Sequence, residues 1–366
     1  MKRRSYFCAI LCGLAVTTGL VSCSDDDEWD STAEGSSIEM AKTRAFVLNE
    51  GSYGLNNATI TYFDYSTDTP YSADLFYAQN GTTIGDTGQD LIEEDDYLYL
   101  SVYGSNYVAK LNSVGVEVGR VSFNSHSALG QVRFLTAEDG YLYVTTYGGY
   151  VAKVNTSTMA IVDSVKVGDN PEQIIDEEGY IYCVNSGWGY DNRLSIINQK
   201  TFKLEQNVEI FYNPQAIVES EDYIAIQGYG GEYPNYTYPV AVFDTKTNTY
   251  EVIGTGTNIA ADDGILYVAN CETDYSSYPY TSTTTFYSYN FYTGVITNDV
   301  LKNVPSDLAN GSVYGLNINE ETGHIYVLCT DFISGAGTVY HFNGSGNYVG
   351  SFSSYGYNPR KIVFLD

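Results

Sequence analysis

Residues 131–167 read QVRFLTAEDGYLYVTTYGGYVAKVNTSTMAIVDSVKV, with aromatic and aliphatic residues alternating with polar ones in short runs. Alternation with a period of two is typical of strands whose two faces meet different surroundings. Turn-forming residues separate the runs, at Asp139-Gly140 and at Thr156-Ser157-Thr158. The stretch therefore predicts four consecutive strands, over residues 131–136, 141–147, 150–155 and 160–167.

One phrase of this stretch recurs along the chain: an acidic turn, then alternating Tyr, Ile or Leu, then a loop of Gly, Asn and Tyr. Self-similarity at about 40–50 residues, with four short strands in each copy, is the signature of a β-propeller. The sequence therefore predicts an all-β, seven-bladed β-propeller, and an open sandwich of the same strands is the alternative. The central aromatic residue of the phrase, or its equivalent, is Phe46, Tyr99, Tyr143, Tyr182, Ala225, Tyr267 and Tyr326.

The two ends of the repeat region complement each other. The first copy lacks an innermost strand, because Ala45 follows a polar segment, whereas the apolar segment 360–365 at the C-terminus is left without a copy of its own. We expect this C-terminal strand to complete the first blade, which closes the ring and covers two strand edges that would otherwise invite aggregation.

The charge balance restricts the partners. The chain of 366 residues carries 17 Lys+Arg and 45 Asp+Glu, a formal net charge of −28. A nucleic acid needs Lys and Arg to displace its counterions, so nucleic-acid binding is excluded, and electrostatic docking on anionic lipid is disfavoured. The 37 tyrosines favour strands, because aromatic residues fit a pleated, half-buried surface.

The N-terminus has the pattern of a secretion signal. Three basic residues, Lys2 to Arg4, precede a short apolar run over residues 7–21, which is typical of a signal peptide rather than a transmembrane helix. The run ends in Leu20-Val21-Ser22-Cys23, which resembles the lipobox of bacterial lipoproteins and implies lipidation of Cys23. The alternative is an ordinary signal peptide with a chance cysteine.

An acidic run, Ser24 to Glu28, follows the cysteine and resembles the surface-export signal of Bacteroidetes lipoproteins. We therefore expect a signal peptide at 1–22, a lipidated acidic tether at 23–40, disordered to about Glu39, and the propeller at 41–366. The resemblance implies an outer-membrane protein that is held by its lipid anchor alone and faces the cell exterior. A plain solvated tether is the alternative reading of the acidic run.

Three cysteines remain after processing, Cys183, Cys271 and Cys329. An odd number excludes a complete disulfide framework. Each lies in or just after an apolar strand, so we expect three buried thiols. None has a neighbouring Cys or His at ligand spacing, so a zinc site is not expected.

The candidate ligand site is a set of loops. In a propeller, the loops between second and third strands share a face with the loops that join successive blades, and here these loops are rich in Tyr, Trp and Asn. Such side chains offer rigid contact area together with hydrogen-bonding tips. The alternative is that many of these tyrosines fill the core. The predicted ligand-binding residues are Tyr53, Tyr103, Tyr147, Trp188, Tyr190, Asn192, Tyr229, Tyr233, Tyr275, Phe332, Asn170, Asn213, Asn310 and Tyr357.

No catalytic motif is apparent, and we expect a protein that is not an enzyme and requires no cofactor. His324 and His341 lie in strand patterns, and His126 has no Ser or Cys partner at a recognisable spacing. A glycosidase or lyase stays open as an alternative, because loop carboxylates such as Asp86 and Asp169 are present and sequence cannot place two of them at catalytic separation. A structural calcium ion in the acidic channel also stays open.

Residues 142–146 and 167–171 resemble the YVTN-type propeller repeat. Together with the lipobox and the acidic export signal, the whole chain resembles the BtuG-type cobalamin-binding surface lipoproteins of Bacteroidetes. That resemblance implies capture of cobalamin or another corrinoid on the loop face and its transfer to a BtuB-type TonB-dependent outer-membrane transporter. A glycan-binding lipoprotein and a protein–protein adaptor of an uptake complex are the alternatives.

Overall fold

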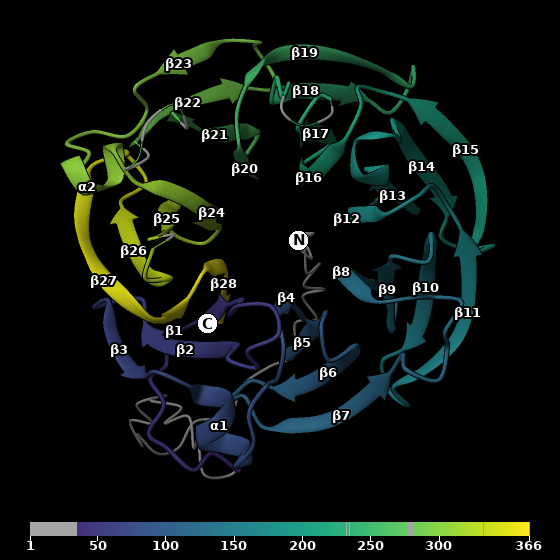
Figure 1. Cartoon of the computed structure of the whole chain (residues 1–366), viewed down its shortest axis with the longest axis horizontal. Coiled ribbons are helices and arrows are strands. Elements are labelled where there is room, and N and C mark those ends of the chain that lie inside the picture. The colour runs from purple at the N-terminus through teal and green to yellow at the C-terminus, as the bar shows by residue number, and fades with distance from the viewer. Residues whose placement is uncertain are drawn as a thin grey trace, which may run out of the picture.

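The computed structural model describes residues 35–231, 233, 235–274, 276, 278, 281–331 and 333–365. Within these residues, seven four-stranded antiparallel sheets stand in a ring, with one strand of each sheet lining the centre (Figure 1). The chain is a seven-bladed β-propeller, so the predicted fold class is confirmed. The predicted signal peptide and Cys23 lie outside the described residues. In the part of the chain that the structure describes, no helix has both the length and the apolar character needed to cross a membrane.

Each blade runs from an inner to an outer strand. Blade 1 consists of β28 (Pro359–Leu365), β1 (Arg44–Asn49), β2 (Thr59–Asp64) and β3 (Thr69–Ser72), and blade 2 of β4 (Gly88–Glu94), β5 (Tyr97–Val102), β6 (Tyr107–Asn112) and β7 (Glu117–Ser122). Blade 3 consists of β8 (Val132–Glu138), β9 (Tyr141–Thr146), β10 (Tyr150–Asn155) and β11 (Ala160–Lys166). Blade 4 consists of β12 (Pro171–Glu177), β13 (Tyr180–Asn185), β14 (Arg193–Asn198) and β15 (Lys203–Glu209).

Blade 5 consists of β16 (Pro214–Ser220), β17 (Tyr223–Gly228), β18 (Pro239–Asp244) and β19 (Thr249–Thr255). Blade 6 consists of β20 (Asn258–Asp262), β21 (Ile265–Asp274), β22 (Thr281–Asn290) and β23 (Ile296–Asn298). Blade 7 consists of β24 (Ser312–Asn319), β25 (His324–Thr330), β26 (Ala336–Phe342) and β27 (Tyr348–Tyr357). Two short helices, α1 (Leu75–Asn80) and α2 (Ser306–Ala309), and a 3₁₀ turn, η1 (Gly187–Gly189), lie between strands.

The recurring phrase forms the second strand of each blade, and both faces of this strand are buried. In β9, Leu142 and Val144 join a core cluster with residues of blade 2, whereas Tyr143 points to the other side and joins a cluster with Cys183 of blade 4. Burial on both faces explains why this strand is apolar along its whole length rather than at every second position.

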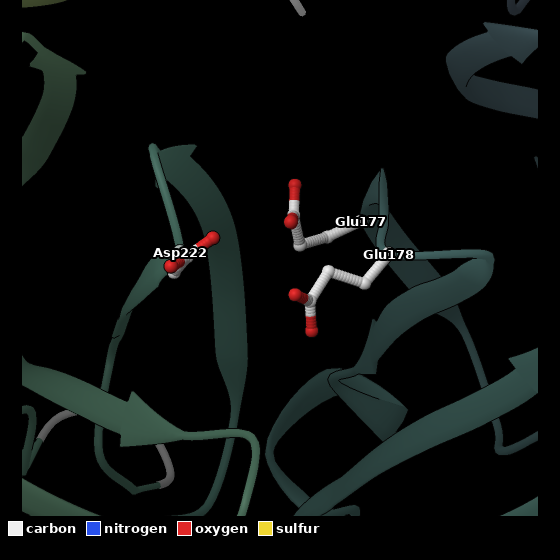
Figure 2. A group of neighbouring side chains, drawn as sticks. All are labelled: Glu177, Glu178 and Asp222. Atoms are coloured by element: carbon white, nitrogen blue, oxygen red, sulfur yellow. The ribbon is translucent and has the colours of Figure 1, made fainter.

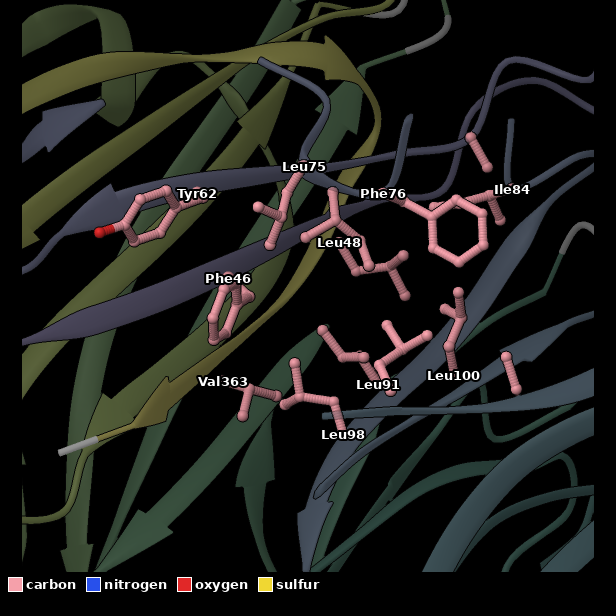
Figure 3. Close-up of a cluster of buried hydrophobic side chains, with 14 of the residues drawn as sticks. Phe46, Leu48, Tyr62, Leu75, Phe76, Ile84, Leu91, Leu98, Leu100 and Val363 are labelled. Atoms are coloured by element: carbon pink, nitrogen blue, oxygen red, sulfur yellow. The ribbon is translucent and has the colours of Figure 1, made fainter. Parts of the chain in front are cut away.

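The C-terminal strand closes the ring as predicted. β28 pairs antiparallel with β1, with Ala45 opposite Phe364 and Phe46 opposite Val363. Val363 lies in the same buried cluster as Phe46 and Leu91, which come from blades 1 and 2 (Figure 3). The closing strand is therefore part of the core as well as of the sheet.

The described chain contacts the propeller before β1 begins. The Ser37 hydroxyl donates a hydrogen bond to the Ala78 carbonyl oxygen at 2.7 Å, and Met40 is buried in the cluster of Phe46. The last residues of the predicted tether, from Ser36 on, thus pack on the protein rather than extend as a disordered segment. The Arg44 guanidinium then donates to the Ser113 carbonyl oxygen at 2.8 Å, which fixes the start of β1 beside a turn of blade 2.

The two faces of the ring differ. One face carries the connections between second and third strands and between blades, and we call it the loop face. The opposite face, the turn face, carries tight turns such as Asp139-Gly140, whose residues have φ of 53° and 77°. β1 starts on the turn face. On the loop face, β21 and β22 continue beyond the other blades as a paired hairpin, in which Asp274 lies opposite Thr281.

Candidate ligand site on the loop face

Four aromatic side chains form a continuous row over blades 1 to 4. Ring centroids are 6.1 Å apart for Tyr53 and Tyr103, 5.6 Å for Tyr103 and Tyr147, and 6.1 Å for Tyr147 and Trp188. Tyr53 and Trp188, at the two ends, are 76% and 68% exposed, and the two central rings are half-buried. We call these four residues the aromatic row; the sequence predicted each of them, and the structure brings them together.

The loop of Trp188 is built to present the indole. Trp188 has φ of 52°, a conformation that a bulky residue rarely adopts, and its backbone N–H donates to the Ser186 hydroxyl at 3.3 Å. At Gly187 a Cβ atom would lie 2.7 Å from Cβ of Asp191, so the turn requires glycine. Backbone strain of this kind clusters at ligand sites, which makes Trp188 a candidate ligand contact.

A second aromatic group lies on blade 5, in the connection between β17 and β18. The Tyr229 ring is 4.9 Å from that of Tyr236 and 5.8 Å from that of Tyr238. Tyr233 stands outside them with its ring 6.1 Å from Tyr236, and it is 82% exposed. The predicted residues Tyr229 and Tyr233 therefore belong to a cluster separate from the aromatic row.

A cavity of about 930 Å³ occupies the centre of the ring. At the loop face its wall contains polar side chains, among them Gln215, Asn270 and Tyr314. Deeper in, the wall is apolar, and towards the turn face it includes Glu219 and Glu320. The apolar section includes residues from five inner strands, among them Leu135, Ile174, Ile217, Ile259 and Leu316.

Ion pairs surround the loop-face end of this cavity, which we call the mouth. The Arg133 guanidinium lies 2.5 Å from the Glu172 carboxylate, and the Arg360 guanidinium lies 2.7 Å from the Glu50 carboxylate. Sequence reasoning missed these residues because it looked at loops, whereas Arg133, Glu172 and Arg360 are second residues of inner strands. The available signal was a polar or charged residue near the start of strands that are otherwise apolar.

Two tyrosines hold the carboxylates of the mouth. The Tyr314 hydroxyl donates to Glu50 at 2.8 Å, and the Tyr147 hydroxyl donates to Glu172 at 3.3 Å. Burial raises the pKa of Tyr314 and the pKa of Tyr147, so both phenols stay protonated and keep donating at physiological pH. Tyr147 thus links the aromatic row to the ion pair beneath it.

Two of the predicted asparagines serve the backbone. Asn170 and Asn213 precede Pro171 and Pro214 at the start of inner strands, and they have φ of 46° and 59°. Asn adopts this left-handed conformation more readily than other residues with a side chain. Asn213 is buried, its side chain donating to the Gly231 carbonyl oxygen and accepting from Gln215, so its amide is already hydrogen-bonded within the protein.

The other predicted residues are scattered around the face. Tyr190 is exposed beside Trp188, Tyr357 is exposed at the end of β27, and Asn192 is half-buried. Asn310 is exposed at the end of α2, where its side chain donates to the Ser306 carbonyl oxygen at 2.7 Å. Tyr275 and Phe332 lie outside the described residues.

The turn face carries a carboxylate cluster. Glu177 and Glu178 of blade 4 point towards Asp222 of blade 5 (Figure 2), and one oxygen from each lies within 4.8 Å of the others. Nearby, burial and a hydrogen bond with Glu177 raise the pKa of Glu219 to about 9, and burial and neighbouring acids raise the pKa of Glu94 to about 7. Carboxylate oxygens are calcium ligands, so this cluster is one candidate place for the calcium ion that the sequence left open.

The two strand histidines form a chain with an aspartate across the ring closure. His324 Nδ1 lies 2.8 Å from His341 Nε2, and His341 Nδ1 lies 2.6 Å from Asp68 of blade 1. His341 also stacks on Tyr326 with centroids 4.4 Å apart. Burial lowers the pKa of His324. His126 is exposed, and among the described residues its ring bonds only the neighbouring Ser125 hydroxyl, 3.1 Å from Nδ1.

The three remaining thiols are not equivalent. Cys183 and Cys329 are buried as predicted, and burial raises the pKa of each thiol. Cys271 is only partly buried and lies in the cavity wall, because β21 extends beyond the blade at this point.

No protein-family model and no curated protein matches the sequence. Solved structures match the fold. The chain is similar to the Pan2 WD40 domain of Neurospora crassa (TM-score 0.58, 11% identity, 80% of this chain and 85% of that chain) and to apo AztD of Citrobacter koseri (TM-score 0.56, 9% identity, 88% and 98%). It is also similar to the hydrazine synthase of Kuenenia stuttgartiensis (TM-score 0.55, 15% identity, 67% and 73%). At these identities the likeness concerns the propeller alone.

Proposed function

We propose that this protein is a cell-surface lipoprotein that captures a corrinoid such as cobalamin on its loop face and passes it to a TonB-dependent outer-membrane transporter. The observation that carries the proposal is the aromatic row beside the mouth of a large polar-rimmed cavity. A shelf of rigid rings next to convergent hydrogen-bonding groups is how proteins hold large ligands that have both flat apolar and polar parts.

The extent of the row indicates the size of the ligand. The four rings come from four successive blades, from Tyr53 on blade 1 to Trp188 on blade 4, so a ligand that contacts all of them spans half of the ring. A corrinoid offers a broad ring system with peripheral amides. The amides find partners in Gln215, Asn270 and Tyr314 at the mouth.

The orientation of the chain agrees with a tethered capture protein. β1 begins at the turn face, where Arg44 contacts Ser113. A lipid on Cys23 would therefore hold the protein through its turn face, and the loop face would point away from the membrane. That is the side on which a ligand arrives.

Isothermal titration calorimetry tests the proposal, with the chain from Ser24 onwards and cyanocobalamin as titrant. We expect saturable one-to-one binding, and no response to starch or mannan oligosaccharides. Binding of an oligosaccharide without cyanocobalamin would replace the corrinoid with a glycan, which an aromatic shelf also suits. Binding of neither would contradict the proposal and favour the protein adaptor.

A further inference from the structure

The inner strands carry only three cationic side chains, and all three gather at one side of the mouth. They are Arg133 of β8 and Arg360 and Lys361 of β28, on the two blades that flank blade 2. The guanidinium carbons of Arg133 and Arg360 each lie 5.2 Å from the ring of Phe134. Each of the three is paired with a carboxylate, Arg133 with Glu172, Arg360 with Glu50 and Lys361 with Asp90.

Arg133 is held in place and retains donors. Its Nε and Nη2 donate to Glu172 at 3.2 and 2.5 Å, and its Nη1 donates to Gln89. Its guanidinium carbon lies 4.6 Å from the Tyr147 ring centroid and 5.5 Å from that of Tyr103. These bonds use three of the five guanidinium N–H groups, and among the described residues the other two have no partner. The side chain is 14% exposed and lies in the cavity wall.

Gln89 of blade 2 supplies a second donor beside Arg133. The residue is 1% exposed, and its amide oxygen accepts from Arg133 while its amide nitrogen has no partner in the described part of the chain. A buried donor without an acceptor costs about 1–3 kcal/mol, so the position favours a ligand that brings an acceptor oxygen.

Building on the proposed function, we propose that Arg133, Gln89 and Arg360 form a subsite for an anionic phosphate group of the captured ligand, which lies beside the aromatic row. Arginine presents a planar fork that matches phosphate oxygens, and the rings of Tyr103 and Tyr147 hold that fork in place. The resident carboxylates Glu172 and Glu50 fix the arginines before a ligand arrives, which lowers the ordering cost of binding. The negative charge of the rest of the protein is screened beyond about 8 Å at physiological salt.

The variants must separate binding from folding. Removing Arg133 alone would leave Glu172 buried without its partner, which typically costs about 3–5 kcal/mol of stability. The test therefore uses Arg133→Met together with Glu172→Gln, and Arg133→Lys as the conservative change. Arg120→Met is the matched control, because Arg120 also pairs with a glutamate, Glu117 at 2.7 Å, and stacks on a tyrosine, but on an outer strand. The melting temperature of each variant confirms that it is folded.

Two titrations complete the design. Calorimetry compares cyanocobalamin with dicyanocobinamide, which lacks the nucleotide loop and its phosphate. We expect R133M/E172Q to lose at least about tenfold in affinity for cyanocobalamin, with less than about twofold loss for dicyanocobinamide, R133K to be intermediate, and R120M to match the wild type. Equal losses for both corrinoids, or no loss for either, would overturn the subsite and leave the proposed function standing.

Saturation-transfer NMR with phenyl phosphate tests the subsite without any corrinoid. The wild type and R120M should saturate this probe, and R133M/E172Q should not, with benzyl alcohol as the neutral comparison. Absence of saturation in the wild type would overturn the subsite. If the wild type saturates phenyl phosphate but does not bind cyanocobalamin, the subsite is supported and the proposed corrinoid ligand is rejected.

Discussion

At the scale of single residues, Trp188 supplies the one indole of the aromatic row. The indole is exposed, and the backbone of Trp188 has the strained left-handed conformation. We expect Trp188→Ala and Tyr103→Ala each to weaken cyanocobalamin binding by about 2 kcal/mol, or about 30-fold, because Trp and Tyr are the residues that most often dominate the energy of an interface. Calorimetry of both variants measures this. Tyr77→Ala is the control, since Tyr77 is an exposed tyrosine on α1, and an equal loss there would contradict the assignment.

Glu219 yields a pH prediction. Its pKa is raised from the ordinary value of 4.5 to about 9, chiefly by burial. The folded state therefore holds a proton that the unfolded state releases, and the stability contributed by this group is lost as pH rises from about 4.5 to about 9, by up to about 1.4 kcal/mol per pH unit. Glu219→Gln mimics the protonated form and should be more stable than the wild type at pH 8 but not at pH 4.5.

Chemical denaturation at both pH values measures the effect of Glu219→Gln. Glu205→Gln is the matched control, because Glu205 is an exposed glutamate on the outer strand β15. A Glu219→Gln protein whose advantage is the same at pH 4.5 and pH 8 would show that the carboxyl group is not protonated by its surroundings.

Residue roles were only partly predictable from the sequence. The rings of the aromatic row were predictable because Tyr and Trp are unusual in short polar loops. Asn170 and Asn213 appeared to be ligand contacts, yet the same residue type serves left-handed turns, and only coordinates separate the two uses. Arg133 was invisible because its role depends on Glu172 and Gln89, which come from two other blades.

At the scale of elements, β28 is the strand whose loss opens the ring. Ile362 is buried in a cluster with Ala45 and Val47 of β1. We expect Ile362→Ala to cost about 2–4 kcal/mol, in the range for buried aliphatic truncations, whereas Val349→Ala on the exposed outer strand β27 should stay within about 0.5 kcal/mol. Urea denaturation compares them, and equal effects would contradict a structural role for β28.

Deletion of residues 359–366 is the stronger form of the same test. It exposes the edge of β1 and removes Val363 from the core beside Phe46. We expect loss of cooperative thermal unfolding and aggregation through the open edge. A truncated protein that melts like the full chain would show that the ring does not depend on closure by the C-terminal strand.

Element boundaries followed from turn chemistry where the turns are tight. The strands predicted at 141–147 and 150–155 are observed as β9 and β10 within one residue, because Gly and polar residues mark each reversal. The extension of β21 and β22 could not be predicted. Residues Cys271 to Asp274 and Thr281 to Thr284 show no alternation of apolar and polar residues that would distinguish a strand from a loop. These two segments pair with each other, at Cys271 with Thr284 and at Asp274 with Thr281.

At the scale of the whole molecule, a bound ligand should stabilise the ring because it contacts several blades at once. At a ligand concentration about 100 times the dissociation constant, binding to the folded state adds about 2.7 kcal/mol. We therefore expect cyanocobalamin to raise the melting temperature by about 4 °C, measured by calorimetric scanning. A shift that persists unchanged in Trp188→Ala would place the ligand elsewhere than on the aromatic row.

The sequence predicted the architecture because seven similar copies each report the same blade. It could not predict the mouth, because each of the seven blades contributes a different residue there. These residues are therefore not part of the recurring pattern. The cavity, with its polar rim and apolar wall, is a property of the closed ring rather than of any one copy.

The most direct measurement is the fluorescence of Trp188 during titration with cyanocobalamin. The chain has two tryptophans, so Trp29→Phe leaves Trp188 as the only reporter. We expect Trp188 emission to change saturably with the stoichiometry found by calorimetry, and its quenching by acrylamide to fall as the ligand covers the indole. Binding detected by calorimetry while Trp188 keeps its emission and its full access to acrylamide would contradict capture on the aromatic row.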